Sequence, residues 1–131
     1  MNEPQKEKRE EGGSGRGSAS LSGHGRIRPA RMSDVRAIHS LLTYFSNKNL
    51  MLPRSISSLF DHLRDFVVYE EGDAILGICA LHICWDDLAE IRSLAVDESR
   101  QKVGIGRLLV NSCLDEAASL APALDTVIRN T

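Results

Sequence analysis

The 131-residue sequence has no long hydrophobic run, little cysteine and no excess of charge of one sign. No apolar stretch approaches the ~20 residues that a membrane-spanning helix needs, so we expect no membrane partner. A net charge of −2 gives no overall attraction to nucleic acid, which argues against a nucleic-acid partner. The three cysteines contain no CxxC pair, so we predict no metal site and reduced core thiols in a cytoplasmic protein: Cys79, Cys84 and Cys113.

The first 26 residues, MNEPQKEKREEGGSGRGSASLSGHGR, also have few apolar side chains. A segment this rich in glycine, serine and charge cannot offset its ordering entropy, so we predict a disordered tail over Met1–Arg26. Its glutamates argue against a mitochondrial presequence, although its Arg and Ser content leaves organellar import open. The rest, residues 27–131, is enough for one domain with one core.

The first half of this domain shows the helical spacing of apolar residues. Ile27 and Arg28 predict a short strand, which Pro29 ends because it has no backbone donor. Ser33 is the expected N-cap of a first helix, and Ser55 that of a second, shorter helix. The residues predicted to face the core are Val35, Ile38, Leu41, Leu42 and Phe45 in the first helix and Ile56, Leu59, Phe60 and Leu63 in the second.

The second half begins with residues typical of strands. It predicts strands at Phe66–Tyr69, Ala74–Trp85 and Ala89–Val96, a helix at Gly104–Ser119 and a last strand at Leu124–Ile128. Gly72 and Asp73 are the expected turn of the first hairpin, and Asp86 and Asp87 form the next turn. The last helix is expected to bury Ile105, Leu108, Leu109 and Leu114.

Two glycines in the stretch QKVGIG precede this last helix. Gly104 and Gly106 would let backbone N–H groups approach a ligand, and a helix N-terminus favours an anion such as phosphate. A Walker loop does not fit, because Arg107 and Leu108 stand where it needs Lys and Ser or Thr; a dinucleotide fingerprint would need glycine at Leu109. From the glycines alone, a loop that needs glycine only for its turn is the favoured interpretation.

The surroundings of the glycines change this interpretation. Gln101, Gly104 and Gly106 fit Q/R-x-x-G-x-G/A between a strand and a helix, which resembles the pyrophosphate-binding signature of the GNAT family of acetyl-coenzyme A dependent N-acetyltransferases. The resemblance covers Ile27 to Ile128 and implies an α/β (α+β) fold, with a mixed, mostly antiparallel central sheet flanked by helices. The stretches YEEGDAILGICALHI and EIRSLAV resemble the branch that acetylates the α-amino group of glutamate or related amino acids, as N-acetylglutamate synthase does.

The resemblance also implies where acetyl-coenzyme A, the expected cosubstrate, would bind. Backbone amides of the glycine loop would hold the pyrophosphate, Lys102 and Arg107 would add positive charge, and backbone groups of the preceding strand would pair with the pantetheine arm. The residues implied are Leu94, Ala95, Val96, Gln101, Lys102, Val103, Gly104, Ile105, Gly106 and Arg107.

Acetyl transfer to an amine needs a base that takes a proton from the amine. Glu90 is the candidate, because it lies fourteen positions before Gly104, where histone-acetylating members of the family carry their glutamate base; a solvated strand residue is the alternative. Strand alternation places Arg92 on the same face, where it could bind a substrate carboxylate or pair with Glu90 or Asp87. His82 is interpreted as a hydrogen-bonded strand residue rather than as a base.

The sequence departs from the family at its C-terminal end. Family members continue into another helix and further strands, and this chain does not, so we interpret it as truncated unless a homodimer covers its last strand. Two hypotheses follow: an N-acetyltransferase that acts on an amino acid, a protein or another small amine, and a non-catalytic module that keeps the fold.

Overall fold

The computed structural model describes residues 19–21, 25–121 and 125–128. Its centre is a six-stranded sheet in the order β1-β2-β3-β4-β5-β6, in which every pair is antiparallel except the parallel pair β5 and β6. The strands are β1 Ala19–Leu21, β2 Gly25–Pro29, β3 Phe66–Glu71, β4 Ala74–Trp85, β5 Leu88–Val96 and β6 Asp125–Ile128. The expected mixed, mostly antiparallel sheet is confirmed, and the predicted last strand forms over all its described residues.

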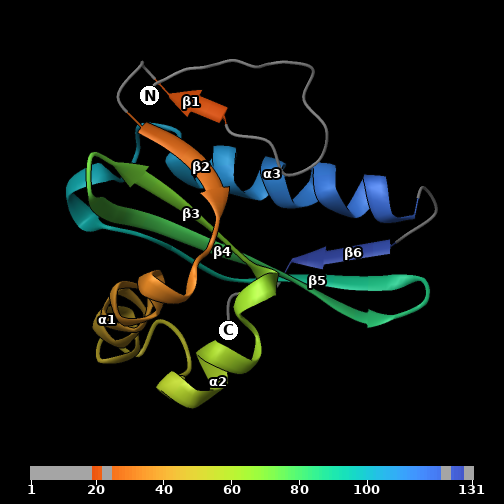
Figure 1. Cartoon of the computed structure of the whole chain (residues 1–131), viewed down its shortest axis with the longest axis horizontal. Helices are drawn as coiled ribbons and strands as arrows, with labels where there is room; N and C mark the ends of the chain where they lie inside the picture. The colour runs from red at the N-terminus through yellow and green to blue at the C-terminus, as the bar shows by residue number, and fades with distance from the viewer. Residues whose placement is uncertain (1–18, 22–24, 122–124, 129–131) are drawn as a thin grey trace.

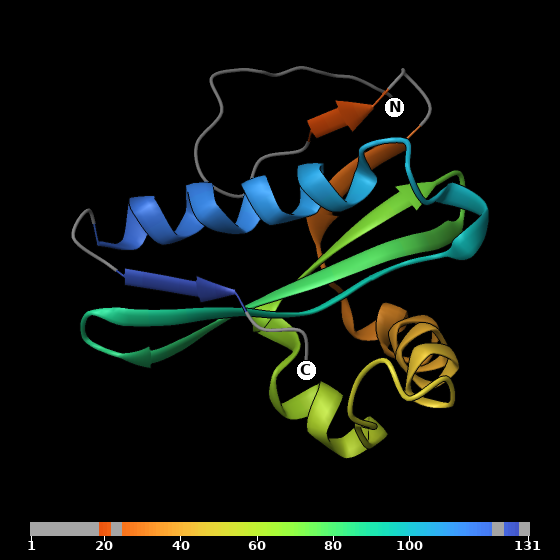
Figure 2. The same ribbon diagram turned by 180° about the vertical axis from the view of Figure 1, so that it is seen from behind.

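Helices cover both faces of this sheet (Figures 1 and 2). Helices α1 (Val35–Ser46) and α2 (Ile56–Asp61) lie on one face, and α3 (Ile105–Leu120) lies on the other. Two clusters of buried side chains fill the layers, one between the sheet and α1 and α2, the other between the sheet and α3. Alternate residues of the strands point into one layer or the other, because successive side chains of a strand face opposite ways.

The first helix begins differently from the sequence prediction. A 3-10 turn over Met32–Asp34 precedes α1, and Asp34, not Ser33, is the residue at the N-cap. The Asp34 carboxylate accepts the Arg31 backbone N–H at 2.7 Å and two hydrogen bonds from Arg28. A carboxylate with partners on both the turn and β2 fixes the helix start better than a serine hydroxyl would.

The N-terminal boundary of the fold also differs. Ala19–Leu21 form β1, which pairs with β2 from Ala19↔Ile27 to Leu21↔Gly25, so this part of the predicted disordered tail is ordered. Backbone hydrogen bonds to an open sheet edge order such a strand whatever its side chains, and composition does not report them. Gly25 and Arg26, also within the predicted tail, belong to β2, and residues 1–18 and 22–24 lie outside the described residues.

Most of the predicted buried faces are confirmed, with two corrections. Phe60 of α2 is 47% exposed and Leu114 of α3 is 37% exposed, whereas both were expected in the core. Helix α2 is so short that only Leu59 among its residues is fully buried. In α3, Cys113 takes the inward position that was assigned to Leu114, four residues after Leu109. The expected Ser55 cap is present: its hydroxyl oxygen accepts the Ser58 N–H at 3.0 Å.

Two irregularities interrupt the pairing of β4 with β5. Near the end of β5 the register passes from Ala80↔Arg92 to Ile78↔Ala95, so β5 holds one extra residue opposite Cys79. The bulge contains Ser93, whose φ of +58° is unusual for a residue with a side chain. It separates the two halves of β5 that the candidate site uses. In the described part of the chain, no helix combines the length and the apolar content that a membrane crossing requires.

Candidate active site

The glycine loop lies between the end of β5 and the start of α3, as the sequence predicts. Asp97 follows β5 and caps a short 3-10 turn over Glu98–Arg100. The Gln101 side-chain amide donates to the Val96 carbonyl oxygen at 3.0 Å. The loop is thus fastened to the last residue of the strand, which directs the following backbone toward the open end of β5.

Gly104 is the N-cap of α3 and has a φ of +96°. A side chain would be strained in this conformation even though no atom crowds the position, so the turn itself requires the glycine. At Gly106 a Cβ would meet only Val96, at 3.9 Å, which is an ordinary van der Waals contact, so packing does not require the second glycine. The first backbone N–H groups of a sixteen-residue helix lack intrahelical partners and attract anions.

Charged side chains surround this helix start. Arg107 and Lys102 are exposed, as is Val103, and Ile105 is buried in the core and anchors the first turn. Lys102 has a φ of +69°, so two residues of the loop adopt left-handed conformations that turn the chain sharply into α3. This arrangement suits a pyrophosphate, because backbone amides could contact its oxygen atoms and two cationic side chains lie nearby.

The second half of β5 is open along one edge. Strand β6 pairs with β5 from Leu88↔Asp125 to Ile91↔Ile128, and in the described residues no strand lies beside Arg92–Val96 on that side. Figure 2 shows β6 beside the part of β5 nearest the β4–β5 turn. Along this edge the backbone of Leu94–Val96 therefore retains groups that can pair with an extended, amide-containing ligand, although the Val96 carbonyl oxygen already accepts the Gln101 amide.

Glu90 and Arg92 lie together on the face of the sheet that carries α1 and α2. Glu90 opposes His82 and Arg92 opposes Ala80, with no register shift between them. The Arg92 Nη1 donates to Glu90 Oε1 at 3.2 Å, and their side chains are only 23% and 16% exposed. The expected alternation is confirmed, and so is the pairing of Arg92 with Glu90 that the sequence left open. Asp87 is exposed at the β4–β5 turn and forms no ion pair with Arg92 that the described side chains show.

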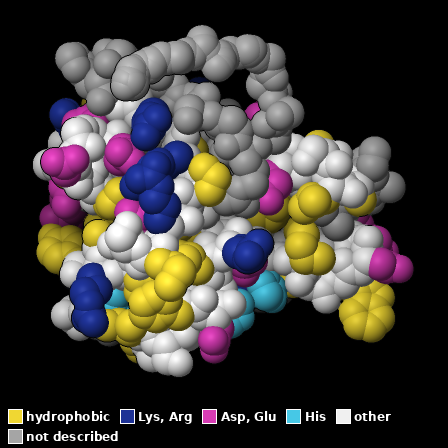
Figure 3. Space-filling model, viewed as in Figure 1, with side chains coloured by type: hydrophobic (Ala, Val, Ile, Leu, Met, Phe, Trp, Pro, Cys, Tyr) yellow, Lys and Arg dark blue, Asp and Glu magenta, His cyan; other side chains and the backbone are white. Residues whose placement is uncertain are grey.

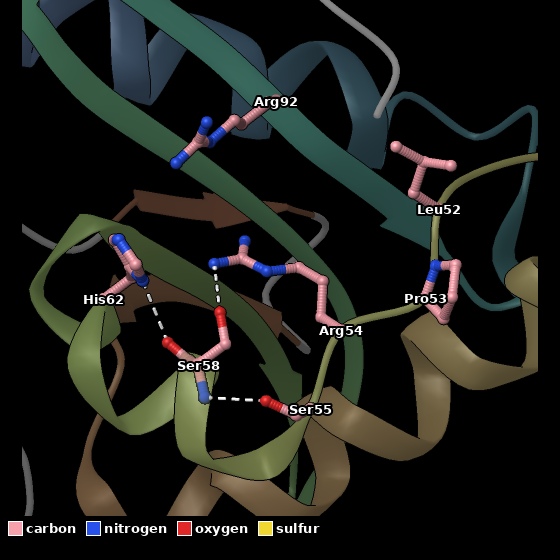
Figure 4. Close-up of a pocket in the computed structure, with 7 residues that line it drawn as sticks. All are labelled: Leu52, Pro53, Arg54, Ser55, Ser58, His62 and Arg92. Atoms are coloured by element: carbon pink, nitrogen blue, oxygen red, sulfur yellow. Dashed lines mark hydrogen bonds between the residues drawn. The ribbon is translucent and has the colours of Figure 1, made fainter.

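A pocket of about 390 Å³ lies beside these residues. Figure 4 shows the guanidinium groups of Arg92 from β5 and Arg54 from the loop before α2, both reaching into the same space. The pocket is lined by Leu52, Pro53, Arg54, Ser55, Ser58, His62 and Arg92. Sequence reasoning missed Arg54, because it stands in an irregular loop with no periodic pattern; its position next to the Ser55 helix cap was the available signal.

Arg54 is held by hydroxyl groups and an aromatic ring rather than by a carboxylate. It donates to the hydroxyl oxygens of Ser93 and Ser58, both at 3.3 Å, and its guanidinium lies 5.4 Å from the Phe66 ring centroid. Burial and repulsion from Arg92 lower the pKa of Arg54, and attraction to Asp65 offsets only part of this. Among the described side chains no carboxylate forms an ion pair with Arg54. Two neighbouring guanidinium groups of this kind favour an anionic ligand between them.

The remaining side chains with reactive groups include three cysteines and a histidine that contacts an aspartate. Cys79 and Cys113 are buried in one cluster, as predicted, whereas Cys84 is exposed. A hydrogen bond with Cys113 and burial both raise the pKa of the Cys79 thiol, so it is no nucleophile at neutral pH. His82 Nδ1 lies 2.7 Å from Asp65 Oδ2, next to the pocket. In the described residues no cluster of His, Cys, Asp and Glu could hold a metal ion.

Curated proteins with similar sequences are acetyltransferases. An uncharacterized N-acetyltransferase of Chlorobaculum tepidum is 42% identical over 84 residues, which are 64% of this chain and 54% of that protein. The amino-acid acetyltransferase of Mycobacterium tuberculosis is 37% identical over 97 residues, which are 72% of this chain and 55% of that protein. The chain thus spans about half the length of these relatives.

Solved structures show the same fold. A crystal structure of a Mycobacterium tuberculosis protein in complex with CoA and NLQ has a TM-score of 0.71 at 35% identity, covering 78% of this chain and 62% of that one. N-acetylglutamate synthase from Neisseria gonorrhoeae, complexed with coenzyme A and N-acetyl-glutamate, has a TM-score of 0.73 at 27% identity, covering 78% of this chain and 24% of that one. The sequence model of the acetyltransferase (GNAT) family matches residues 30–130. The chain therefore belongs to the GNAT family of acetyltransferases.

Proposed function

We propose that this chain transfers an acetyl group from acetyl-coenzyme A to the α-amino group of glutamate or a similar amino acid. The observation that carries the proposal is the convergence of Arg54 and Arg92 on one pocket, beside Glu90. Glu90 pairs with Arg92, and no described carboxylate forms an ion pair with Arg54, so an acceptor without a carboxylate would leave the two positive charges only partly compensated. An amino-acid acceptor supplies that anion, as is consistent with the relatives that are amino-acid acetyltransferases.

The coenzyme site of this proposal is the glycine loop with the open half of β5. Amides from Val103 to Arg107, at the start of α3, would hold the pyrophosphate, with Lys102 and Arg107 as cations and Gln101 fixing the loop to β5. Backbone groups of Leu94–Val96 would pair with the pantetheine amides. The structural relatives in complex with CoA support this assignment.

The bulge at Ser93 joins the two sites. It lies between Arg92, in the acceptor pocket, and Leu94, at the open strand edge, so one strand serves both substrates. In the proposed reaction the Glu90 carboxylate takes a proton from the acceptor ammonium, and the neutral nitrogen attacks the thioester carbon. The new C–N bond replaces the C–S bond, and the thiolate leaves with coenzyme A. Holding both reactants on one rigid strand contributes through proximity.

Thiol release from acetyl-coenzyme A tests this function. L-glutamate should release free thiol, whereas propylamine, which has no carboxylate, should release little. The second hypothesis, a non-catalytic module, predicts that coenzyme A raises the melting temperature while no amino acid releases thiol. Equal rates with glutamate and propylamine would contradict the role of the arginine pair and favour another class of amine.

A further inference from the structure

The reaction proposed above has a proton to dispose of. An acceptor that enters as an ammonium ion and leaves as an amide loses two protons, and the departing thiolate takes up one of them to become the thiol. One proton per turnover must therefore reach the solvent. Glu90 is poorly placed to deliver it directly, because its side chain is 16% exposed and receives a hydrogen bond from Arg92.

His82 stands directly across the sheet from Glu90. The two are register partners in the pairing of β4 with β5, so their side chains are on the same face with Cβ atoms about 5 Å apart. At this Cβ separation the Glu90 carboxyl group and the His82 imidazole are near enough for a proton to pass directly or through one water molecule. The His82 side chain is 32% exposed, twice as much as that of Glu90, so solvent reaches His82 more readily. In Figure 3 histidine side chains reach the surface between α2 and the β4–β5 hairpin.

The partners of His82 prepare it for this role. Asp65, in the turn after α2, has a carboxylate oxygen 2.7 Å from the His82 Nδ1. An ionised carboxylate only accepts hydrogen bonds, so Nδ1 carries the hydrogen and Nε2 keeps a lone pair that can take a proton. The same carboxylate stabilises the imidazolium that then forms, which is the function of the aspartate in a Ser-His-Asp triad.

The other charged and titratable groups on this face do not replace Asp65. His62 lies edge-on to His82 with ring centroids 5.6 Å apart, and its Nδ1 is 3.0 Å from the Ser58 carbonyl oxygen. Arg92 and Arg54 are cations that disfavour a second positive charge nearby. Among these groups only Asp65 forms a hydrogen bond with the His82 ring, so Asp65 is the residue that fixes the orientation of the imidazole.

On the basis of the acetyl transfer proposed above, we propose that His82 is a positioning residue. Oriented by Asp65, it relays the proton from Glu90 to the solvent. The Glu90 carboxyl gives its proton to His82 Nε2, and the imidazolium gives it to water or buffer. Glu90 is thereby returned to its carboxylate form for the next turnover. No bond to the substrate forms at His82, so the residue controls turnover rather than binding.

Kinetics of the full chain with acetyl-coenzyme A and glutamate test the relay. His82→Gln should lower kcat about ten- to a hundredfold, at or below the usual range for a general acid or base, with KM for glutamate unchanged. Added imidazole should restore much of this rate, because it carries protons where the side chain is missing. Asp65→Asn should show a smaller loss and the same response to imidazole. His39→Gln, on α1 and outside the pocket, is the matched control and should change neither kcat nor the imidazole response.

The relay would be overturned by full kcat in His82→Gln, or by a loss that imidazole does not restore, which would indicate a structural role. Nitrogen NMR of the labelled full chain adds a test that needs no activity. His82 should be the Nδ1–H tautomer, and an Nε2–H tautomer would overturn the relay. A chain that acetylates no amino acid would contradict the proposed function, and the tautomer alone would then decide whether His82 can accept a proton.

Discussion

At the scale of single residues, Glu90 is the carboxylate nearest to the proposed chemistry. If it takes the proton from the acceptor, Glu90→Gln should lower kcat roughly 10²- to 10⁴-fold, because an amide cannot act as a base. Coenzyme binding should be unchanged, since the loop and strand edge that would hold it are backbone groups of other residues. Assays of thiol release measure the loss of kcat, and a thermal-shift titration with coenzyme A measures coenzyme binding separately.

The pH dependence distinguishes a base from a structural carboxylate. High pH supplies free amine and should recover part of the rate of Glu90→Gln. A rate loss that stays constant with pH would mean that Glu90 acts only by positioning Arg92, with which it forms a hydrogen bond at 3.2 Å. Full activity of the variant at every pH would remove the carboxylate from the mechanism.

Arg54 and Arg92 should determine which acceptor is used. Arg92→Ala and Arg54→Ala should each raise KM for glutamate strongly and have little effect on propylamine, because only glutamate offers a carboxylate to pair. Lysine at either position should restore part of the binding, since it keeps the charge and loses the bidentate geometry. Comparing kcat/KM for the two acceptors measures this discrimination. Equal losses on both would instead indicate that the arginines support the strand and the loop.

The catalytic candidates show what sequence can predict at this scale. Glu90 and Arg92 could be placed on one face because strand alternation is strict where no bulge intervenes. Arg54 could not be placed, since a loop has no period and its path depends on contacts such as the hydrogen bond to Ser93, 39 residues away. The pairing of His82 with Asp65 likewise joins elements whose approach only the fold determines.

At the scale of elements, the loop between β5 and α3 is the feature whose role can be tested most cleanly. Gly104→Val should abolish the rise in melting temperature that coenzyme A produces, because the β-branched side chain strains a φ of +96° and moves the backbone amides. Gly72→Val is the matched control: Gly72 also has a positive φ, of +58°, with no atom within 4 Å of its Cβ position. Both variants should be less stable than the wild type, but only Gly104→Val should lose the rise in melting temperature with coenzyme A.

If coenzyme A raised the melting temperature of Gly104→Val and Gly72→Val equally, the coenzyme would not bind at the loop between β5 and α3. The comparison matters because left-handed strain alone lowers the free energy of unfolding by about 1–3 kcal/mol at each position, and with it the melting temperature, without any effect on a ligand. The two glycines differ in location: Gly72 lies in the turn between β3 and β4, and Gly104 begins α3.

Element types were easier to predict than their ends and their partners. The long strands and α3 follow from clear apolar periods, and β6 forms where the last apolar segment predicts it. The 3-10 turn before α1 was missed because the Asp34 carboxylate, rather than a serine cap, fixes the helix start through Arg28 on another element. Strand β1 was missed because its pairing depends on the open edge of β2, not on its own composition.

At the scale of the whole molecule, one buried cluster of charges ties the sheet to its helical layer. Arg28 of β2 donates to both Asp34 oxygens, at 2.8 and 3.0 Å, and also pairs with Glu70 of β3. Removal of one partner leaves a buried charge incompletely compensated, so Asp34→Asn should lower the free energy of unfolding by roughly 3 kcal/mol, near the lower end for buried pairs. Urea denaturation at neutral pH measures this loss.

The same cluster should make stability depend on pH in a defined direction. Burial by itself would raise the pKa of Asp34, but hydrogen bonds from Arg28 and the Arg31 amide outweigh it and hold the pKa below its usual range. A carboxyl whose pKa is lowered by folding contributes stability above its unfolded pKa, about 3.9, and loses it as the pH falls through the folded value. The wild-type chain should therefore lose stability on acidification below about pH 4, and Asp34→Asn should lose less over the same range.

Glu98→Gln is the matched control for this last prediction. Hydrogen bonds from Tyr44 and Lys48 also lower the pKa of Glu98, but its side chain is 50% exposed and solvent screens the pair. Its removal should change the neutral stability far less than Asp34→Asn does. If the two variants lost equal stability at neutral pH, or if Asp34→Asn kept the full acid dependence of the wild type, the Arg28 cluster would not be what holds α1 to the sheet. Because α1 packs on the face that carries Glu90 and Arg92, failure of this cluster at low pH should also disorder the acceptor pocket, and glutamate turnover should fall together with stability.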